Sequence, residues 1–139
     1  MGLTLSQETL SLALRDPFKI ARSASGEGMR ITTVIVELRD DRYPGVVGVG
    51  EGYPDAYYGE TPATMTVVLE ELLSGIGEPE LTSAGLVGAS HAMDRTIRWN
   101  GAAKCALDIA LHDADGRADR LDPRQRRRRR DVAGVKDEI

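Results

Sequence analysis

The chain has 139 residues and a formal net charge of −4, and 41% of its residues are hydrophobic. These values fit one modest soluble domain. No run of about 18 apolar residues occurs, and the N-terminus lacks a basic region followed by an apolar stretch, which argues against a membrane span and a secretory leader. The single cysteine, Cys105, cannot form an internal disulfide. We therefore expect a cytoplasmic protein with Cys105 in its core.

Three segments in the first half of the chain have the composition of β-strands. The first runs from Leu3 to Ile20 and is interrupted or bent at Pro17. The second, Met29 to Arg39, is rich in β-branched residues. The third, Val46 to Tyr53, contains glycines that would let another backbone approach closely. The short connection D-D-R-Y-P-G favours an antiparallel meander.

Three helices are predicted in the second half. The first has Thr61 as its N-cap and Pro62 in its first turn, and it ends before Gly75. The second covers Ser83 to Met93 and is weakened by two glycines. The third begins at an N-cap, Asn100, and ends at a glycine stop, Gly116. Strands followed by helices indicate an α+β fold.

The third predicted helix has one polar stripe and an otherwise apolar surface. Lys104, Asp108 and His112 are spaced four apart, so they share one side of the helix. We expect Asp108 to pair with Lys104 and with His112. Asp108 and His112 alone do not make a metal site, because such a site needs further ligands. A helix so widely apolar is expected to be covered by protein on several sides.

The composition changes after Gly116. Residues 1–116 hold 9 basic and 17 acidic residues, whereas residues 117–139 hold 9 basic and 5 acidic residues and no apolar stripe. We therefore divide the chain into a domain at 1–116 and a disordered Arg-rich tail at 117–139. Six arginines between Arg124 and Arg130 could bind nucleic-acid phosphates with steep salt dependence, which is the alternative function of a different class. No aromatic residue interleaves them for base stacking, so a nucleic-acid partner is disfavoured.

Three motifs occur in a particular order. F-K-I-A-R follows the first strand, G-E-G-Y-P-D-A-Y-Y-G-E-T-P follows the third, and A-A-K-C-A-L-D-I-A-L-H-D-A-D-G lies in the last helix. Together they resemble the amino-terminal capping domain of the enolase superfamily, within it the muconate-lactonizing branch and in particular the dipeptide (L-Ala-D/L-Glu) epimerases. The resemblance runs from about Thr4 to Gly116. It implies a three-stranded antiparallel meander and a small helical bundle packed against a catalytic (β/α) barrel.

The resemblance also implies a chemistry that this chain does not carry. In such enzymes a lysine removes the proton next to a carboxylate, and a magnesium ion held by barrel carboxylates stabilises the enediolate. A barrel takes about 250 residues, so it is absent here. None of the lysines, Lys19, Lys104 and Lys136, stands in the family's K-x-K pattern. We predict no catalytic residue and no bound Mg²⁺ in this chain, and no activity of the fragment alone.

The Arg-rich tail stands where the barrel would begin. We interpret it as the product of a shift in reading frame near Gly116, because out-of-frame translation of a GC-rich gene gives arginine-dense sequence without a pattern. The parent enzyme would act on a dipeptide or another small carboxylate. An acid-sugar dehydratase or a cycloisomerase of the same superfamily is the alternative. Glu51 and Asp108 match family positions that we interpret as structural.

Two loops match the capping loops that close over the substrate in this superfamily. In the loop Ala21–Gly28, Arg22 could donate a bidentate pair of hydrogen bonds to a substrate carboxylate. The alternative is a solvated arginine. In the loop Pro54–Glu60, Tyr57 and Tyr58 could form apolar walls with a polar tip, the alternative being a hydrophobic staple over the next helix. The surface that faces the barrel in the parent is uncovered here, which favours self-association.

Overall fold

The structure, a computed structural model, describes residues 2–16 and 30–121. Three strands, β1 (Leu3–Ala13), β2 (Arg30–Asp40) and β3 (Val47–Gly52), form one antiparallel sheet in the order β1-β2-β3. A short 3₁₀ turn and three helices follow: η1 (Ala56–Tyr58), α1 (Pro62–Ile76), α2 (Ser83–Thr96) and α3 (Gly101–Leu121). The α+β fold and the antiparallel meander are thus confirmed, and no barrel is present among the described residues.

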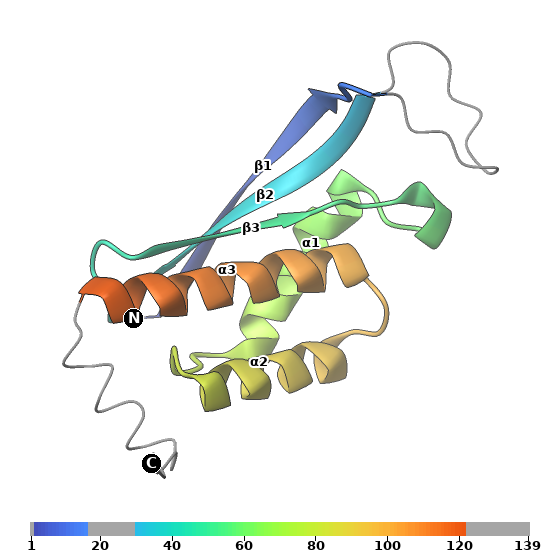
Figure 1. The fold of residues 1–139 in the computed structure, drawn as a ribbon. Helices are drawn as coiled ribbons and strands as arrows, with labels where there is room; N and C mark the ends of the chain where they lie inside the picture. Colours follow the sequence, from blue (N-terminus) through green and yellow to red (C-terminus); the bar gives the residue numbers. More distant parts are fainter. Residues whose placement is uncertain (1, 17–29, 122–139) are drawn as a thin grey trace, which may run out of the picture.

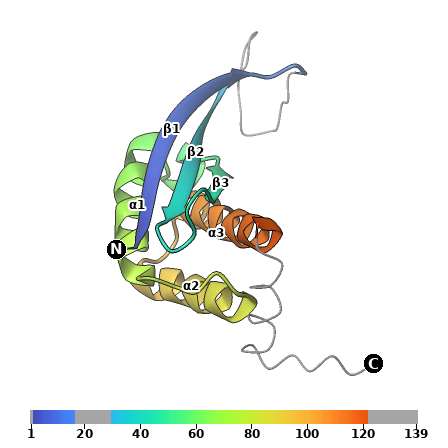
Figure 2. The same ribbon diagram turned by 90° about the vertical axis from the view of Figure 1, so that its left-hand side faces the viewer.

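The helices lie at two distances from the sheet. α1 and α3 pack against the strands, with α3 running alongside β3 (Figure 1). α2 packs on α1 and α3 and makes no substantial contact with a strand, so it lies farthest from the sheet (Figure 2). The core between these elements is built from aliphatic side chains on one face of β2, from α1 and from α3, namely Val34, Val36, Leu38, Leu69, Leu72, Leu107 and Leu111.

The predicted close approach of a backbone to the third strand is confirmed. Gly48, Gly50 and Gly52 point toward α3, and a Cβ built on any of them would overlap a carbonyl oxygen of that helix. The facing side of α3 is a stripe of buried alanines, Ala102, Ala106, Ala110 and Ala114. Small residues on both elements let the helix lie directly on the strand. α3 therefore covers β3 with backbone-to-backbone packing.

The first predicted strand was too long. β1 ends at Ala13, which pairs with Arg30, the first residue of β2. Leu14 to Asp16 lie outside the strand. The predicted continuation from Pro17 to Ile20 lies outside the described residues.

Two glycines that were predicted to end helices lie inside them. α1 runs through Gly75, which lies against the Thr96 side chain of α2, and ends at Ile76, before Gly77, whose φ of 63° is one that glycine readily adopts. α3 runs through Gly116 to Leu121. A glycine inside a helix costs only about 1 kcal/mol. The next turn of α3 offsets this cost with a buried residue, Ala118, and an ion pair between Arg117 and Asp113 at 2.8 Å.

Two further predictions need correction. Asn100 stands directly before α3, but its side-chain amide donates to the Arg98 carbonyl at 2.9 Å, and its φ of 56° is left-handed. Asn100 therefore does not act as a side-chain N-cap acceptor. Cys105 is exposed instead of buried, because it lies on the side of α3 turned away from β3, in line with the exposed Ile109. α2 continues three residues beyond its predicted end, to Thr96.

Candidate functional site

The loop that carries the two predicted tyrosines is a compact turn held by its own hydrogen bonds. The Asp55 carboxylate accepts the Tyr57 amide at 2.9 Å, and the Asp55 carbonyl accepts the amides of Tyr58 at 2.9 Å and Glu60 at 3.2 Å. Gly59 adopts a left-handed φ of 78°, and its amide donates to the Ala56 carbonyl. We call residues 55–60 the tyrosine turn. Its backbone conformation is fixed from within.

The tyrosine rings stand out from this turn. The residues are 64% and 73% exposed, and the ring centroids lie 5.0 Å apart in an edge-to-face arrangement at 88°. Such a pair is a favourable aromatic geometry. This exposure argues against a staple packed on α1, and the contact of the tyrosines with substrate stays a prediction. Arg22 and the rest of its loop, Ala21–Gly28, lie outside the described residues, so their role stays a prediction.

The tyrosine turn shares one end of the molecule with the connection between α2 and α3 (Figure 1). That connection contains Trp99, which is 86% exposed and has a left-handed φ of 60°. The two segments are joined by the Glu60 carboxylate, which accepts the Ala102 amide at 3.3 and 3.4 Å. Sequence reasoning missed both Trp99 and Glu60. The signal for Glu60 was slight, since only its place beside the paired tyrosines set it apart.

The polar stripe of α3 is engaged in structural contacts. Lys104 pairs with Asp94 of α2 at 2.8 Å, so the predicted pair between Lys104 and Asp108 is wrong, because the neighbouring helix supplies the carboxylate. This hydrogen bond and the charge of Lys104 lower the pKa of the Asp94 carboxyl. His112 Nε2 lies 3.9 Å from Asp108 Oδ2, as expected.

Two other carboxylates bind the sheet. Asp113 accepts the backbone amide of Val49 at 2.9 Å, which ties α3 to β3. Glu51 accepts the Thr33 hydroxyl at 2.8 Å, which fits the structural role predicted for it.

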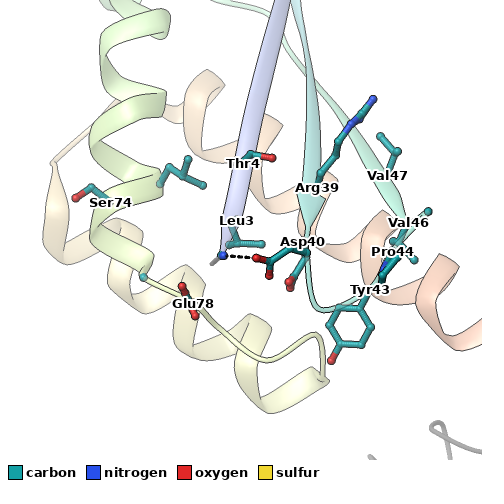
Figure 3. Close-up of a pocket in the computed structure, with 15 residues that line it drawn as sticks. Leu3, Thr4, Arg39, Asp40, Tyr43, Pro44, Val46, Val47, Ser74 and Glu78 are labelled. Carbon is teal, nitrogen blue, oxygen red and sulfur yellow. Dashed lines mark hydrogen bonds between the residues drawn. The ribbon is translucent and has the colours of Figure 1, made fainter.

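A cavity of about 770 Å³ lies at the other end of β3, between the start of β1, the β2–β3 turn and the end of α1 (Figure 3). The Gly2 amide donates to Asp41 there at 3.0 Å. Asp40 is buried beside it, and Arg42 donates to both Asp40 carboxylate oxygens at 2.7 to 3.1 Å. This contact raises the pKa of the Arg42 guanidinium. Neither Tyr57 nor Tyr58 lines the cavity, so it is separate from the tyrosine turn.

Comparison with known proteins decides the family. The family model of the mandelate racemase / muconate lactonizing enzyme N-terminal domain matches residues 4–122. The chain belongs to this family. As an N-terminal domain of the mandelate racemase and muconate lactonizing group, it lies in the enolase superfamily, whose members similar to it include racemases, epimerases and cycloisomerases.

Three relatives illustrate this similarity. The chain is 34% identical over 101 residues to a chloromuconate cycloisomerase of Pseudomonas putida, covering 65% of this chain and 26% of that protein. It is 29% identical, with a TM-score of 0.63, to a dipeptide epimerase of Cytophaga hutchinsonii complexed with Mg and the dipeptide D-Ala-L-Val, covering 80% of this chain and 29% of that one. It is 28% identical, with a TM-score of 0.69, to an N-succinyl Arg/Lys racemase of Bacillus cereus, covering 84% and 31%.

The N-terminal domain thus spans between a quarter and a third of these relatives. Residues 2–16 and 30–121 contain no group of three or more His, Cys, Asp or Glu side chains that could hold a metal ion. These described residues therefore do not offer a ligand set for an ion such as the Mg²⁺ of the Cytophaga enzyme. No helix in the described part of the chain is long and apolar enough to cross a membrane. Lys19, Lys136 and the run Arg124–Arg130 lie outside the described residues.

Proposed function

We propose that this chain is the substrate-capping part of an enzyme that removes a proton α to a carboxylate, and that the parent activity is epimerisation of a dipeptide. The observation that carries the proposal is the tyrosine turn. Two rings are held outward, edge to face, by a turn with fixed backbone at the end of a well-packed domain. Rigid aromatic side chains with polar tips suit recognition of a small ligand that has apolar and polar parts.

The catalytic groups would come from the barrel domain of the parent enzyme. The one described lysine, Lys104, is bound to Asp94 and lies on α3. The chain alone should therefore not exchange the α-proton of a dipeptide. The direct test is deuterium uptake from heavy water by L-Ala-L-Glu in the presence of the purified chain and magnesium. Exchange above that of a protein-free control would refute this part of the proposal.

The capping role is tested with a chimera. Residues 4–122 would replace the matching domain of the Cytophaga hutchinsonii dipeptide epimerase. We expect the chimera to epimerise dipeptides with an altered preference, and Tyr57→Ala and Tyr58→Ala to change kcat/KM among dipeptides by about tenfold, the usual effect of lost apolar pocket contacts. A comparison variant is Tyr43→Ala, which changes a tyrosine of the β2–β3 turn at the far end of the domain that is partly buried against the core. Equal effects of all three changes would argue against substrate selection by the tyrosine turn.

A cycloisomerase is the second candidate, favoured by the 34% identity to the Pseudomonas putida enzyme. The same graft into that cycloisomerase separates the two. If the domain supports cycloisomerisation of chloromuconate but no dipeptide epimerisation, the cycloisomerase proposal replaces the first.

The end of the domain that carries Tyr57, Tyr58 and Trp99 exposes aromatic surface, and we expect the purified chain to self-associate there. Sedimentation velocity over a range of concentrations measures this association. A Trp99→Ser variant should weaken it.

A further inference from the structure

The N-terminus of α3 is capped from a distant part of the chain. A helix start leaves backbone N–H groups without partners, and a residue directly before the helix usually supplies the acceptor. Asn100 occupies that place, but its amide is turned to the Arg98 carbonyl. Instead, both carboxylate oxygens of Glu60 approach the Ala102 amide, at 3.3 and 3.4 Å. Glu60 precedes Ala102 by 42 residues, so the contact joins two separate segments.

The electrostatics of this contact favour a carboxylate. The N-terminal end of a helix carries partial positive charge, and a negative side chain there is stabilised. Glu60 is half-buried, which limits competition from water for its oxygens. The local backbone around Asn100 has two successive left-handed residues, Trp99 at 60° and Asn100 at 56°. Such a conformation is costly for residues other than glycine, and it persists only where surrounding contacts hold it.

Glu60 is also part of the tyrosine turn. Its amide donates to the Asp55 carbonyl, the same oxygen that accepts the Tyr58 amide. The Glu60 side chain thus connects the turn to α3 through both of its carboxylate oxygens. On the other side, Thr61 begins α1 through a reciprocal cap with Thr64. Fixing the Glu60 side chain against α3 fixes the direction in which the tyrosine rings point.

We propose that Glu60 is a positioning residue: by capping α3 it holds the tyrosine turn in the orientation that presents Tyr57 and Tyr58. This inference rests on the proposed role of that turn in contacting the substrate. Glu60 touches no reacting group in it. Its contribution is to reduce the freedom of the loop before a ligand arrives, which lowers the entropic cost of binding.

The experiment uses two-dimensional amide NMR and hydrogen exchange on the chain itself, with three variants. In Glu60→Ala we expect the Ala102 amide to exchange about tenfold faster, because it loses its acceptor. We also expect lower order parameters for the amides of Tyr57 and Tyr58. Glu60→Gln keeps a carbonyl oxygen without the charge and should restore part of both signals. Glu71→Ala removes the same charge from an exposed position on α1 and should change neither.

Two results would overturn the proposal. If the Ala102 amide changes but the tyrosine amides stay ordered, Glu60 caps the helix without positioning the turn. If neither changes, the contact is absent in solution. Should Glu60→Ala unfold, the same comparison is made with Glu60→Gln. No substrate enters this measurement, so a failed chimera would refute the proposed function and leave the positioning role standing.

Discussion

Replacing Gly50 by alanine tests the contact on which the fold depends most directly. A Cβ at this position would overlap the Ala106 carbonyl oxygen and lie 2.9 Å from the Ala110 amide nitrogen. Both atoms belong to the backbone of α3, so no side chain can rotate away. The helix must move off the strand, and the alanines packed around the contact would lose part of their burial.

The size of this effect follows from the cost of overpacking. Extra methylenes in a well-packed core cost about 1 to 3 kcal/mol, and a clash with immovable backbone lies at the upper end. Since a domain has only about 5 to 15 kcal/mol of stability, Gly50→Ala removes a large share. For a domain of about 100 residues, we expect the Tm to fall by about 10 °C or more.

The assay is thermal and urea unfolding followed by far-ultraviolet circular dichroism, with Gly116→Ala as the matched control. Gly116 lies in the same helix, but a Cβ there meets nothing within 4 Å. Alanine should therefore raise the stability by about 0.5 to 1 kcal/mol through its better helix propensity. A Gly50→Ala variant with the Tm of the parent chain would show that α3 does not lie on β3 as described.

Three further changes test individual contacts. Asp40→Asn should cost about 2 kcal/mol, because Arg42 loses a buried carboxylate that is 2% exposed, and an unchanged urea midpoint would contradict this. Thr61→Ala should lower the free energy of unfolding by about 1 kcal/mol, because it removes the N-cap of α1. Unaltered amide exchange in the first turn of α1 would contradict this. Lys104→Met should raise the pKa of Asp94 toward its ordinary value. The depressed pKa of Asp94 adds stability at pH values above the pKa of the unfolded chain, and this stability is lost as the pH falls through the folded pKa. The Lys104→Met variant should therefore lose less stability in acid than the parent chain. A carboxyl NMR titration that shows no shift of the Asp94 pKa would refute this.

Much of the fold could be predicted from local patterns. Alternation and β-branched residues located the three strands, and Thr61 with Pro62 marked the start of α1. Helix ends were predicted less well, because a glycine in a helical sequence can either end the helix or make room for a side chain of a neighbouring helix. Gly75 makes room for Thr96, and Gly77, directly after α1, has a positive φ. The sequence around each glycine does not distinguish these roles, since the deciding contact is with another helix.

The same reasoning applies to the candidate site. The paired tyrosines are conspicuous within their motif, and both are exposed. Their contact with substrate stays a prediction. The contact between Glu60 and Ala102 could not be predicted, because it depends on how α1 and α3 pack on the sheet. Lys104 likewise pairs with Asp94 of α2, although its own helix offers Asp108 one turn away. Long-range partners replaced local ones in both cases.

The C-terminal end of the domain can also be located from packing. The domain was predicted to end at Gly116, yet Ala118 is buried and Arg117 bonds to Asp113. The family match reaches residue 122, one residue beyond α3. We infer that the domain extends through α3 and that any shift in reading frame lies at or after residue 122. The coding sequence past that codon should then continue, in another frame, into the leucine-rich start of a barrel; its absence from every frame would leave the arginine run as a feature of the protein itself.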